Sequence, residues 1–161
     1  MKYKVLVVED DDDTAAIEAI ALRKLNFEVE IVNHGDLAIP KMKEWKPEVV
    51  VLDLELPGKN GLQILQEMLL DPDLRNLIIV ANTVHMDAKD DLGFAYYAHY
   101  QRVKNEEPIM INKIGRDQGK HLDLSYVIVN MIGQKYGHLP QYLGEWLQKR
   151  DPAGKKWDVV Q

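Results

Sequence analysis

Carboxylate side chains follow two short apolar segments of the chain, at the point where each segment stops. Glu9 and Asp10 come directly after residues 4–8, and Asp53 comes directly after residues 49–52. Carboxylates that crowd together repel one another unless a cation neutralises them. Oxygen ligands without imidazole or thiolate favour a hard cation, Mg²⁺ ahead of the transition metals. We therefore expect a Mg²⁺ site if the fold brings these acids together.

Two other apolar runs also end in polar residues. Asn82 and Thr83 follow residues 77–80, and Lys113 follows shortly after residues 108–111. A Mg²⁺ ion held by one or two carboxylates usually keeps coordination positions for water and phosphate oxygens. A lysine beside it would add a second positive charge for a phosphate group. A carboxylate nucleophile between Mg²⁺ and a lysine is a phosphoryl-transfer arrangement.

The elements that must position these residues alternate along the chain. We expect strands at residues 4–8, 28–32, 49–52, 77–80 and 108–111. Continuous apolar strands separated by helices are typical of a parallel sheet that is covered on both faces. The predicted fold class is therefore α/β, with a doubly wound five-stranded parallel sheet. Ligands of such sheets bind beyond the carboxyl ends of the strands, where the polar residues above would meet.

Helical periodicity separates the expected strands. We expect helices at residues 14–25, from the turn at 34–36 to about Trp45, and at 62–70. The first helix carries an apolar stripe of Ile17, Ile20, Ala21 and Leu25. Asp12 or Asp13 is well placed as its N-cap. Pro40 falls inside the second helix, where it should cost stability or produce a kink.

Composition narrows the class of protein. The chain has 161 residues, 46% of them hydrophobic, and 26 acidic against 20 basic residues give a net charge of −6. That balance argues against binding to nucleic acid or to a membrane surface, because both reward clustered positive charge. The absence of cysteine excludes disulfides and thiol catalysis. Without a signal peptide or an apolar run of about 18 residues, the expected location is the cytoplasm.

Two segments and one lysine carry a resemblance to a known family. The segments are residues 5–11, VLVVEDD, and residues 49–62, VVVLDLELPGKNGL; the lysine is Lys113. Over about residues 1–114 the chain resembles the receiver domain of two-component response regulators. This resemblance implies the flavodoxin-like receiver fold, and it implies that the protein works as a signalling switch.

The resemblance also implies a role for each residue of the site. Asp53 would be the phosphoacceptor, which takes its phosphoryl group from a histidine kinase or a phosphotransfer protein. Glu9, Asp10, Asp53 and the backbone carbonyl of Glu55 would hold Mg²⁺. Lys113 would pair with the phosphoryl oxygens.

The chain departs from the family pattern at the positions that read out phosphorylation. Members usually carry threonine or serine at the end of the fourth strand, where this chain offers Asn82, with Thr83 one place later. A shift of one residue reverses the direction of a side chain in a strand, so the two residues are alternatives for this switch position. Ile114 stands where the family's lysine is normally followed by proline, and Met110 takes the aromatic position. We expect intact phosphorylation chemistry with an altered readout.

The sequence is compatible with three functions. The leading prediction is a stand-alone phosphorylation-controlled switch that acts by contact with a downstream protein or as a homodimer, and that catalyses only its own phosphorylation and dephosphorylation. The first alternative is a degenerate receiver that serves as an interaction module and is never phosphorylated. The second is an Asp-nucleophile phosphatase that resembles the haloacid dehalogenase group. That group has its Asp-x-Asp motif near the first strand, whereas this chain has Asp53-Leu54-Glu55 after the third.

The last part of the chain goes beyond the family pattern. We expect a receiver domain at residues 1–136 and a helical extension at residues 137–161. The predicted helix around residues 122–132 is apolar nearly all round, whereas a helix on a sheet buries only one stripe. A matching stripe follows it at helical spacing: Leu139, Tyr142, Leu143, Trp146 and Leu147. The extension therefore folds back over its neighbour or exchanges that surface with a partner or a second copy.

Overall fold

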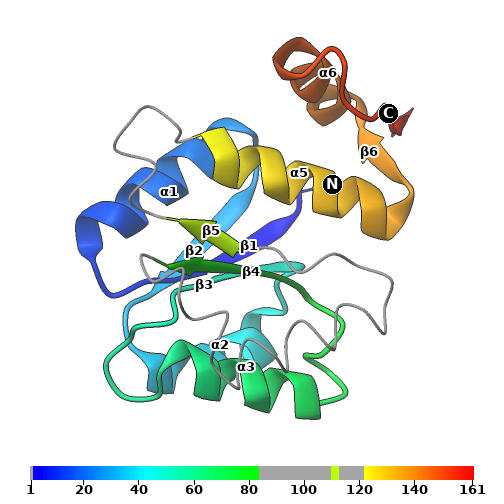
Figure 1. Ribbon diagram of the computed structural model, residues 1–161. Coiled ribbons are helices and arrows are strands. Elements are labelled where there is room, and N and C mark those ends of the chain that lie inside the picture. The colour runs from blue at the N-terminus through cyan, green and yellow to red at the C-terminus, as the bar shows by residue number, and fades with distance from the viewer. Residues whose placement is uncertain (1, 84–109, 113–121) are drawn as a thin grey trace.

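The five segments that were predicted as strands pair as a parallel sheet at the centre of the molecule (Figure 1). The computed structural model describes residues 2–83, 110–112 and 122–161. The sheet has the order β2-β1-β3-β4-β5. Its strands are β1 (Lys4–Val8), β2 (Glu28–Val32), β3 (Val49–Leu52), β4 (Ile78–Thr83) and β5 (Met110–Asn112). This confirms the predicted α/β class and the five-stranded parallel sheet.

Helices cover both faces of the sheet, as continuous apolar strands require. Two of them, α1 (Asp12–Lys24) and α5 (Leu122–Tyr136), lie on one face, and α2 (Ala38–Trp45) and α3 (Gly61–Leu70) lie on the other (Figure 1). Each face has its own core cluster, because alternate residues of β1 point to opposite sides. Val5 and Val7 pack on the α1 side, and Leu6 and Val8 pack on the α2 side.

The fourth strand is longer than its apolar run indicates. β4 continues to Thr83, and its last residues pair with β5 in the register Asn82 to Ile111 and Thr83 to Asn112. The predicted end at residue 80 was therefore wrong. Backbone hydrogen bonds in a sheet need no apolar side chain, so hydrophobicity alone understates a strand that ends in polar residues.

The first helix corrects two predictions. Its N-cap is Asp11, not Asp12 or Asp13, and the Asp11 carboxylate accepts a hydrogen bond from the backbone of Thr14 at 2.8 Å. The buried face is also different from the expected apolar stripe. Ile17 and Ile20 are 49% and 53% exposed, and the face turned to the core is Ala15, Glu18, Ala19 and Leu22. Burial here follows the small alanine side chains, which allow the helix to approach the sheet closely.

The second helix carries its proline in the first turn and not in its interior. A short 3₁₀ turn, η1 (Gly35–Leu37), precedes α2, so Pro40 is the third residue of the α-helix. The first N–H groups of a helix have no partner within the helix, and a missing one costs little there. The helix ends at Trp45, and its C-cap residue Lys46 adopts a left-handed conformation with φ of 54° ahead of Pro47.

The C-terminal part adds more structure than one helix. After α5 come β6 (His138–Pro140), α6 (Gln141–Arg150) and β7 (Asp158–Val160), and β6 and β7 form a parallel pair that we did not predict. Their three-residue length and the proline in β6 leave little signal for a strand. In the described part of the chain, no helix is long and apolar enough to cross a membrane.

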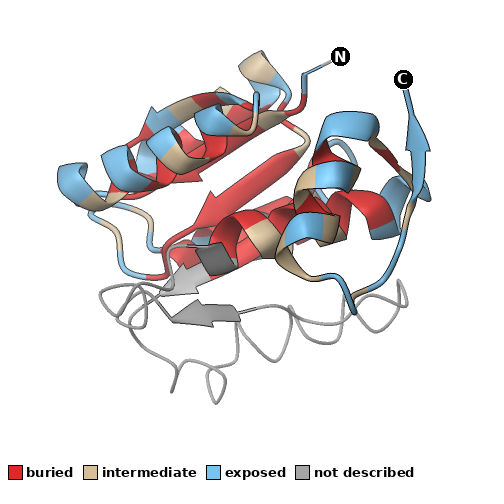
Figure 2. Cartoon of the chain, turned by 90° about the horizontal axis from the view of Figure 1, so that it is seen from above, coloured by how far each residue is buried: buried red, intermediate tan, exposed pale blue. Residues whose placement is uncertain are grey.

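The extension packs on the same core as α1 and β1. Leu139, Leu143 and Leu147 are 0%, 0% and 5% exposed, and they belong to the cluster that contains Val5, Ala19 and Ile128. By contrast, β7 lies on the outside and is exposed (Figure 2). The division of the chain after residue 136 stays a prediction, since the two parts share one core.

Candidate functional site

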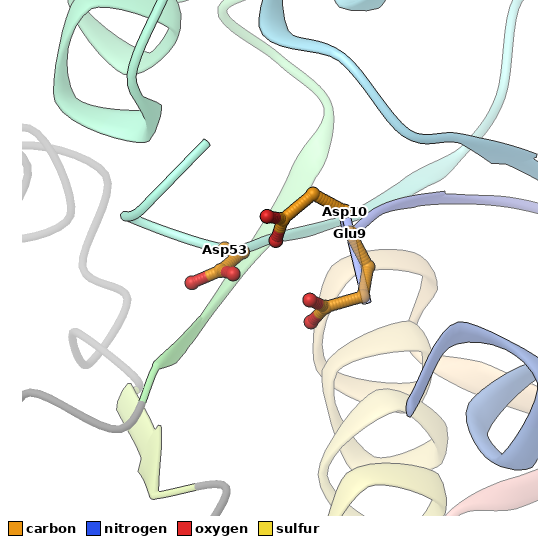
Figure 3. Close-up of side chains that lie close together, drawn as sticks. All are labelled: Glu9, Asp10 and Asp53. Atoms are coloured by element: carbon orange, nitrogen blue, oxygen red, sulfur yellow. The ribbon is translucent and has the colours of Figure 1, made fainter. Parts of the chain in front are cut away.

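Three carboxylates meet at the carboxyl edge of the sheet. Glu9 and Asp10 leave the end of β1 and Asp53 leaves the end of β3, and these strands are neighbours whose last residues pair, Val8 with Leu52. Each acid offers one oxygen to a group in which all oxygens lie within 4.8 Å of one another. Figure 3 shows the three side chains converging from the two strand ends.

The sheet holds the backbone of this group in place. The N–H of Glu9 donates to the carbonyl of Val32, and the N–H of Asp53 donates to the carbonyl of Val8, both at 3.0 Å. These bonds extend the ladder by one residue beyond each strand. Glu9 and Asp53 are 2% and 5% exposed, whereas Asp10 is exposed. The group is therefore rigid at its base and open to solvent on one side.

Backbone N–H groups orient two of the carboxylates. Glu9 accepts a hydrogen bond from the N–H of Asp11 at 3.2 Å, and Asp53 accepts one through Oδ1 from the N–H of Glu55 at 3.1 Å. The second bond brings the backbone of Glu55 next to the Asp53 carboxylate. Both contacts lie within two residues of the acid, so they follow from the loop conformations at the strand ends.

The loop after Asp53 is closed by a glycine at the start of α3. The N–H of Gly61 donates to the carbonyl of Leu54 at 3.0 Å, and Asn60 and Gln63 cap the helix reciprocally. A Cβ atom added to Gly61 would lie 2.1 Å from the carbonyl oxygen of Asp53. No larger residue fits there without moving the backbone that carries the central acid.

We therefore predict that Gly61→Ala lowers the free energy of unfolding by about 1–3 kcal/mol, because the new methyl group overpacks against backbone. Urea unfolding measures the change. Gly144→Ala in α6 is the matched control, because its Cβ would meet a side chain of the exposed strand β7, Val159, and not backbone. Equal free energies of unfolding for the two variants would show that the fold does not depend on the close approach of Gly61 to the backbone of Asp53.

The turn at residues 34–36 packs against the loop that follows Asp53 and holds it by hydrogen bonds. The sequence did not predict this contact. Gly35 donates from its N–H to the carbonyl of Pro57 at 2.9 Å, and the N–H of Lys59 donates to Asp36 at 3.0 Å. A Cβ on Gly35 would overlap the backbone of Lys59, and Gly58 adopts a positive φ of 75°. The available signal was the pair of glycines in the two turns, His-Gly-Asp and Pro-Gly.

The donor set suits a hard divalent cation. It consists of carboxylate oxygens only, with two acids buried and one open to water, which matches how Mg²⁺ binds in proteins. Within the described ranges, no other group of three or more His, Cys, Asp or Glu side chains lies close enough to hold a metal.

Three more side chains were predicted for the site, those of Lys113, Asn82 and Thr83. Lys113 lies outside the described residues. Asn82 and Thr83 are placed at the end of β4, one strand away from Asp53, so their backbone reaches the correct edge of the sheet. Which of the two fills the switch position stays a prediction.

Comparisons with known proteins agree with this geometry. The family described as "Response regulator receiver domain" matches residues 5–100. The DNA-binding response regulator MtrA of Mycolicibacterium smegmatis is 32% identical over 87 residues, which are 54% of this chain and 38% of that protein. The chain thus matches less than two fifths of the length of this curated relative.

Solved structures show the same fold. A putative response regulator from Chloroflexus aurantiacus has a TM-score of 0.66 at 20% identity, covering 83% of this chain and 99% of that chain. The phosphorylated cyanobacterial phytochrome response regulator RcpA has a TM-score of 0.58 at 26% identity, covering 70% of this chain and 81% of that one. The chain belongs to the response regulator receiver domain family.

Proposed function

We propose that this chain is a phosphorylation-controlled switch whose phosphoacceptor is Asp53. The observation that carries the proposal is the convergence of Glu9, Asp10 and Asp53 at the carboxyl edge of the sheet, with oxygens within 4.8 Å of one another. Asp53 is buried, is fixed through its own N–H and accepts the N–H of Glu55, so its carboxylate is held ready for attack. Preorganised charge and position account for most of the catalysis in phosphoryl transfer.

The proposed reaction is a transfer from a phosphohistidine. A carboxylate oxygen of Asp53 attacks the phosphorus, a new P–O bond forms, and the P–N bond to the donor imidazole breaks. The imidazole nitrogen keeps the electron pair and takes up a proton from solvent. Glu9, Asp10, Asp53 and the backbone carbonyl of Glu55 would hold Mg²⁺, which would supply positive charge for the phosphoryl oxygens. Lys113, which follows β5, would pair with the same oxygens.

The partners follow from this chemistry. The phosphodonor is a histidine kinase or a phosphotransfer protein, and the output is contact with a downstream protein or a second copy. The net charge of −6 disfavours direct binding of nucleic acid by this chain, although the MtrA relatives are named as DNA-binding proteins. A phosphorelay partner of this kind places the chain in the cytoplasm.

The test is Mg²⁺-dependent phosphorylation of the purified chain. Incubation with acetyl phosphate and Mg²⁺ should add a single phosphoryl group, as read from the intact mass, and excess EDTA should abolish the gain. No gain in mass, either with or without Mg²⁺, would favour the alternative, a receiver that acts as an interaction module without being phosphorylated. Steady release of phosphate from small esters would instead favour the phosphatase.

A further inference from the structure

The outer face of α1 carries two isoleucines that the core does not use. Ile17 and Ile20 are 49% and 53% exposed, although the opposite side of the helix packs into the core. Both line a groove of about 430 Å³, whose far wall is formed by Ser125 of α5 and by Trp146 and Arg150 of α6. The C-terminal extension therefore comes next to this face of α1 without covering it.

Opposite charges stand at the two ends of this apolar pair. Asp13, Ile17, Ile20 and Lys24 follow one another at spacings of four, three and four residues, and all four are exposed. In a helix this spacing places their side chains within about 60° of one another around the axis. Neither Asp13 nor Lys24 forms an ion pair within the described part of the chain. These four residues make one stripe, the α1 stripe, in the order acid, isoleucine, isoleucine, base.

The α1 stripe is complementary to itself when a second copy runs antiparallel. A two-fold axis at the middle of the helix sets Ile17 of each chain against Ile20 of the other. The same axis sets Asp13 of each chain against Lys24 of the other, so every pairing is made twice. Arg150 lines the groove together with Lys24, which adds a second cation for the acid of the other copy.

The helix dipole accounts for only part of this pattern. Acids at the start of a helix and bases at its end are favoured by the dipole in any single chain. The dipole does not require two isoleucines in solvent between them, and it does not require all four residues to share one face. Apolar side chains that gather on a surface between charged residues are typical of a protein contact.

We propose that two copies of this chain associate through the α1 stripe as a weak, antiparallel, two-fold dimer. The contact is confined to one helix of 13 residues. It therefore buries less than the about 1,200 Å² at which standard interfaces begin. We expect a dissociation constant on the order of 100 µM, so the chain is mainly monomeric at the concentration of a light-scattering run, about 10 µM.

The proposed dimer goes beyond the phosphorylation switch and does not depend on it. The α1 stripe contains none of the three acids that converge at the carboxyl edge of the sheet. Each chain carries its own set of those acids, so phosphorylation of Asp53 needs no second copy. Dimerisation and phosphorylation can therefore succeed or fail separately.

The test is sedimentation of the full chain without Mg²⁺ or phosphodonor, over total concentrations from about 10 µM to about 1 mM. The wild type should change from mainly monomer to mainly dimer over this range. Asp13→Lys and Lys24→Asp should each weaken the dimer at least about tenfold, because both ion pairs become repulsive contacts. Both positions are exposed, so the fold should survive either change. A wild-type chain that stays monomeric at the highest concentration would overturn the proposal.

A mixture of the two variants tests the antiparallel arrangement. In mixed pairs, the lysine introduced at position 13 faces the aspartate introduced at position 24, and the unchanged Lys24 faces the unchanged Asp13. The mixture should therefore dimerise about as tightly as the wild type, although neither variant does so alone. Asp12→Lys is the matched control, since it makes the same charge change in the same exposed turn, about 100° away from Asp13 around the axis. A mixture that stays monomeric, or an equal loss of dimer in Asp12→Lys and Asp13→Lys, would contradict the pairing.

Discussion

Asp10→Ala is expected to weaken Mg²⁺ binding at least about tenfold, the scale seen when even an outer partner of a metal ligand is removed. Asp10 is the exposed member of the three acids, so its removal takes away an anionic oxygen and leaves no buried cavity. The same substitution should raise the thermal stability in metal-free buffer, because one source of repulsion among the acids is gone. Calorimetric titration with Mg²⁺ and thermal unfolding in EDTA measure the two effects.

The control for this prediction is Asp13→Ala, which removes one negative charge from the exposed first turn of α1. It should leave Mg²⁺ affinity nearly unchanged. Glu9→Gln is the second ligand variant, since it keeps the size of a buried side chain while removing its charge. Unchanged metal affinity in both Asp10→Ala and Glu9→Gln would reject these residues as ligands.

Removal of residues 137–161 is expected to leave a chain that self-associates or becomes insoluble. Leu139, Leu143 and Leu147 are buried against α5 and the α1 side of the core, and their loss uncovers apolar surface. Three fully buried leucines contribute roughly 5–9 kcal/mol. That is comparable with the whole stability of a typical domain, about 5–15 kcal/mol. Large exposed apolar patches favour association.

Light scattering coupled to size exclusion measures the outcome of this truncation. A shorter deletion of residues 158–161 removes β7, which is exposed, and should leave the protein monomeric and soluble. A chain that ends at residue 136 and remains monomeric, soluble and equally heat-stable would show that the extension covers nothing.

The predictable parts of the fold are those in which a run of apolar side chains coincides with a buried strand of the backbone. The strands β1 and β3 are continuous apolar runs, and each stops at an acid, so both the sheet and the position of Asp53 follow from the sequence. The pairing of β1 with β3 then brings Glu9 and Asp10 beside it. The grouping of the acids thus depended on topology, which the alternation of strands and helices indicates.

The errors occurred where side-chain hydrophobicity and burial diverge. Ile17 and Ile20 form the apolar stripe of α1, yet the smaller Ala15 and Ala19 face the core. Sequence periodicity identifies an apolar face, and it does not say whether that face meets the sheet or a groove. Indeed, Ile17 and Ile20 line a groove between α1, α5 and α6, which exists because of the extension.

The contact between the two turns beside the site was not predicted, for a different reason. Gly35 and Gly58 lie in separate turns, and only the folded chain shows that the two turns pack against each other. Glycine in a turn is common and carries no information on which distant segment approaches it. A pocket at the amino ends of the strands was equally unpredictable. Tyr3 and Asn26 line it from the beginning of the sequence, and His138 and Tyr142 line it from the end.

The most direct test of the central claim is the site of phosphorylation itself. The wild-type chain, Asp53→Asn and Asp13→Asn are treated alike with acetyl phosphate and Mg²⁺, and their intact masses are compared. The wild type and Asp13→Asn should each gain one phosphoryl group, and Asp53→Asn should gain none, because an amide lacks the nucleophilic carboxylate oxygen. Equal labelling of Asp53→Asn and the wild type would contradict the assignment of Asp53 as the phosphoacceptor.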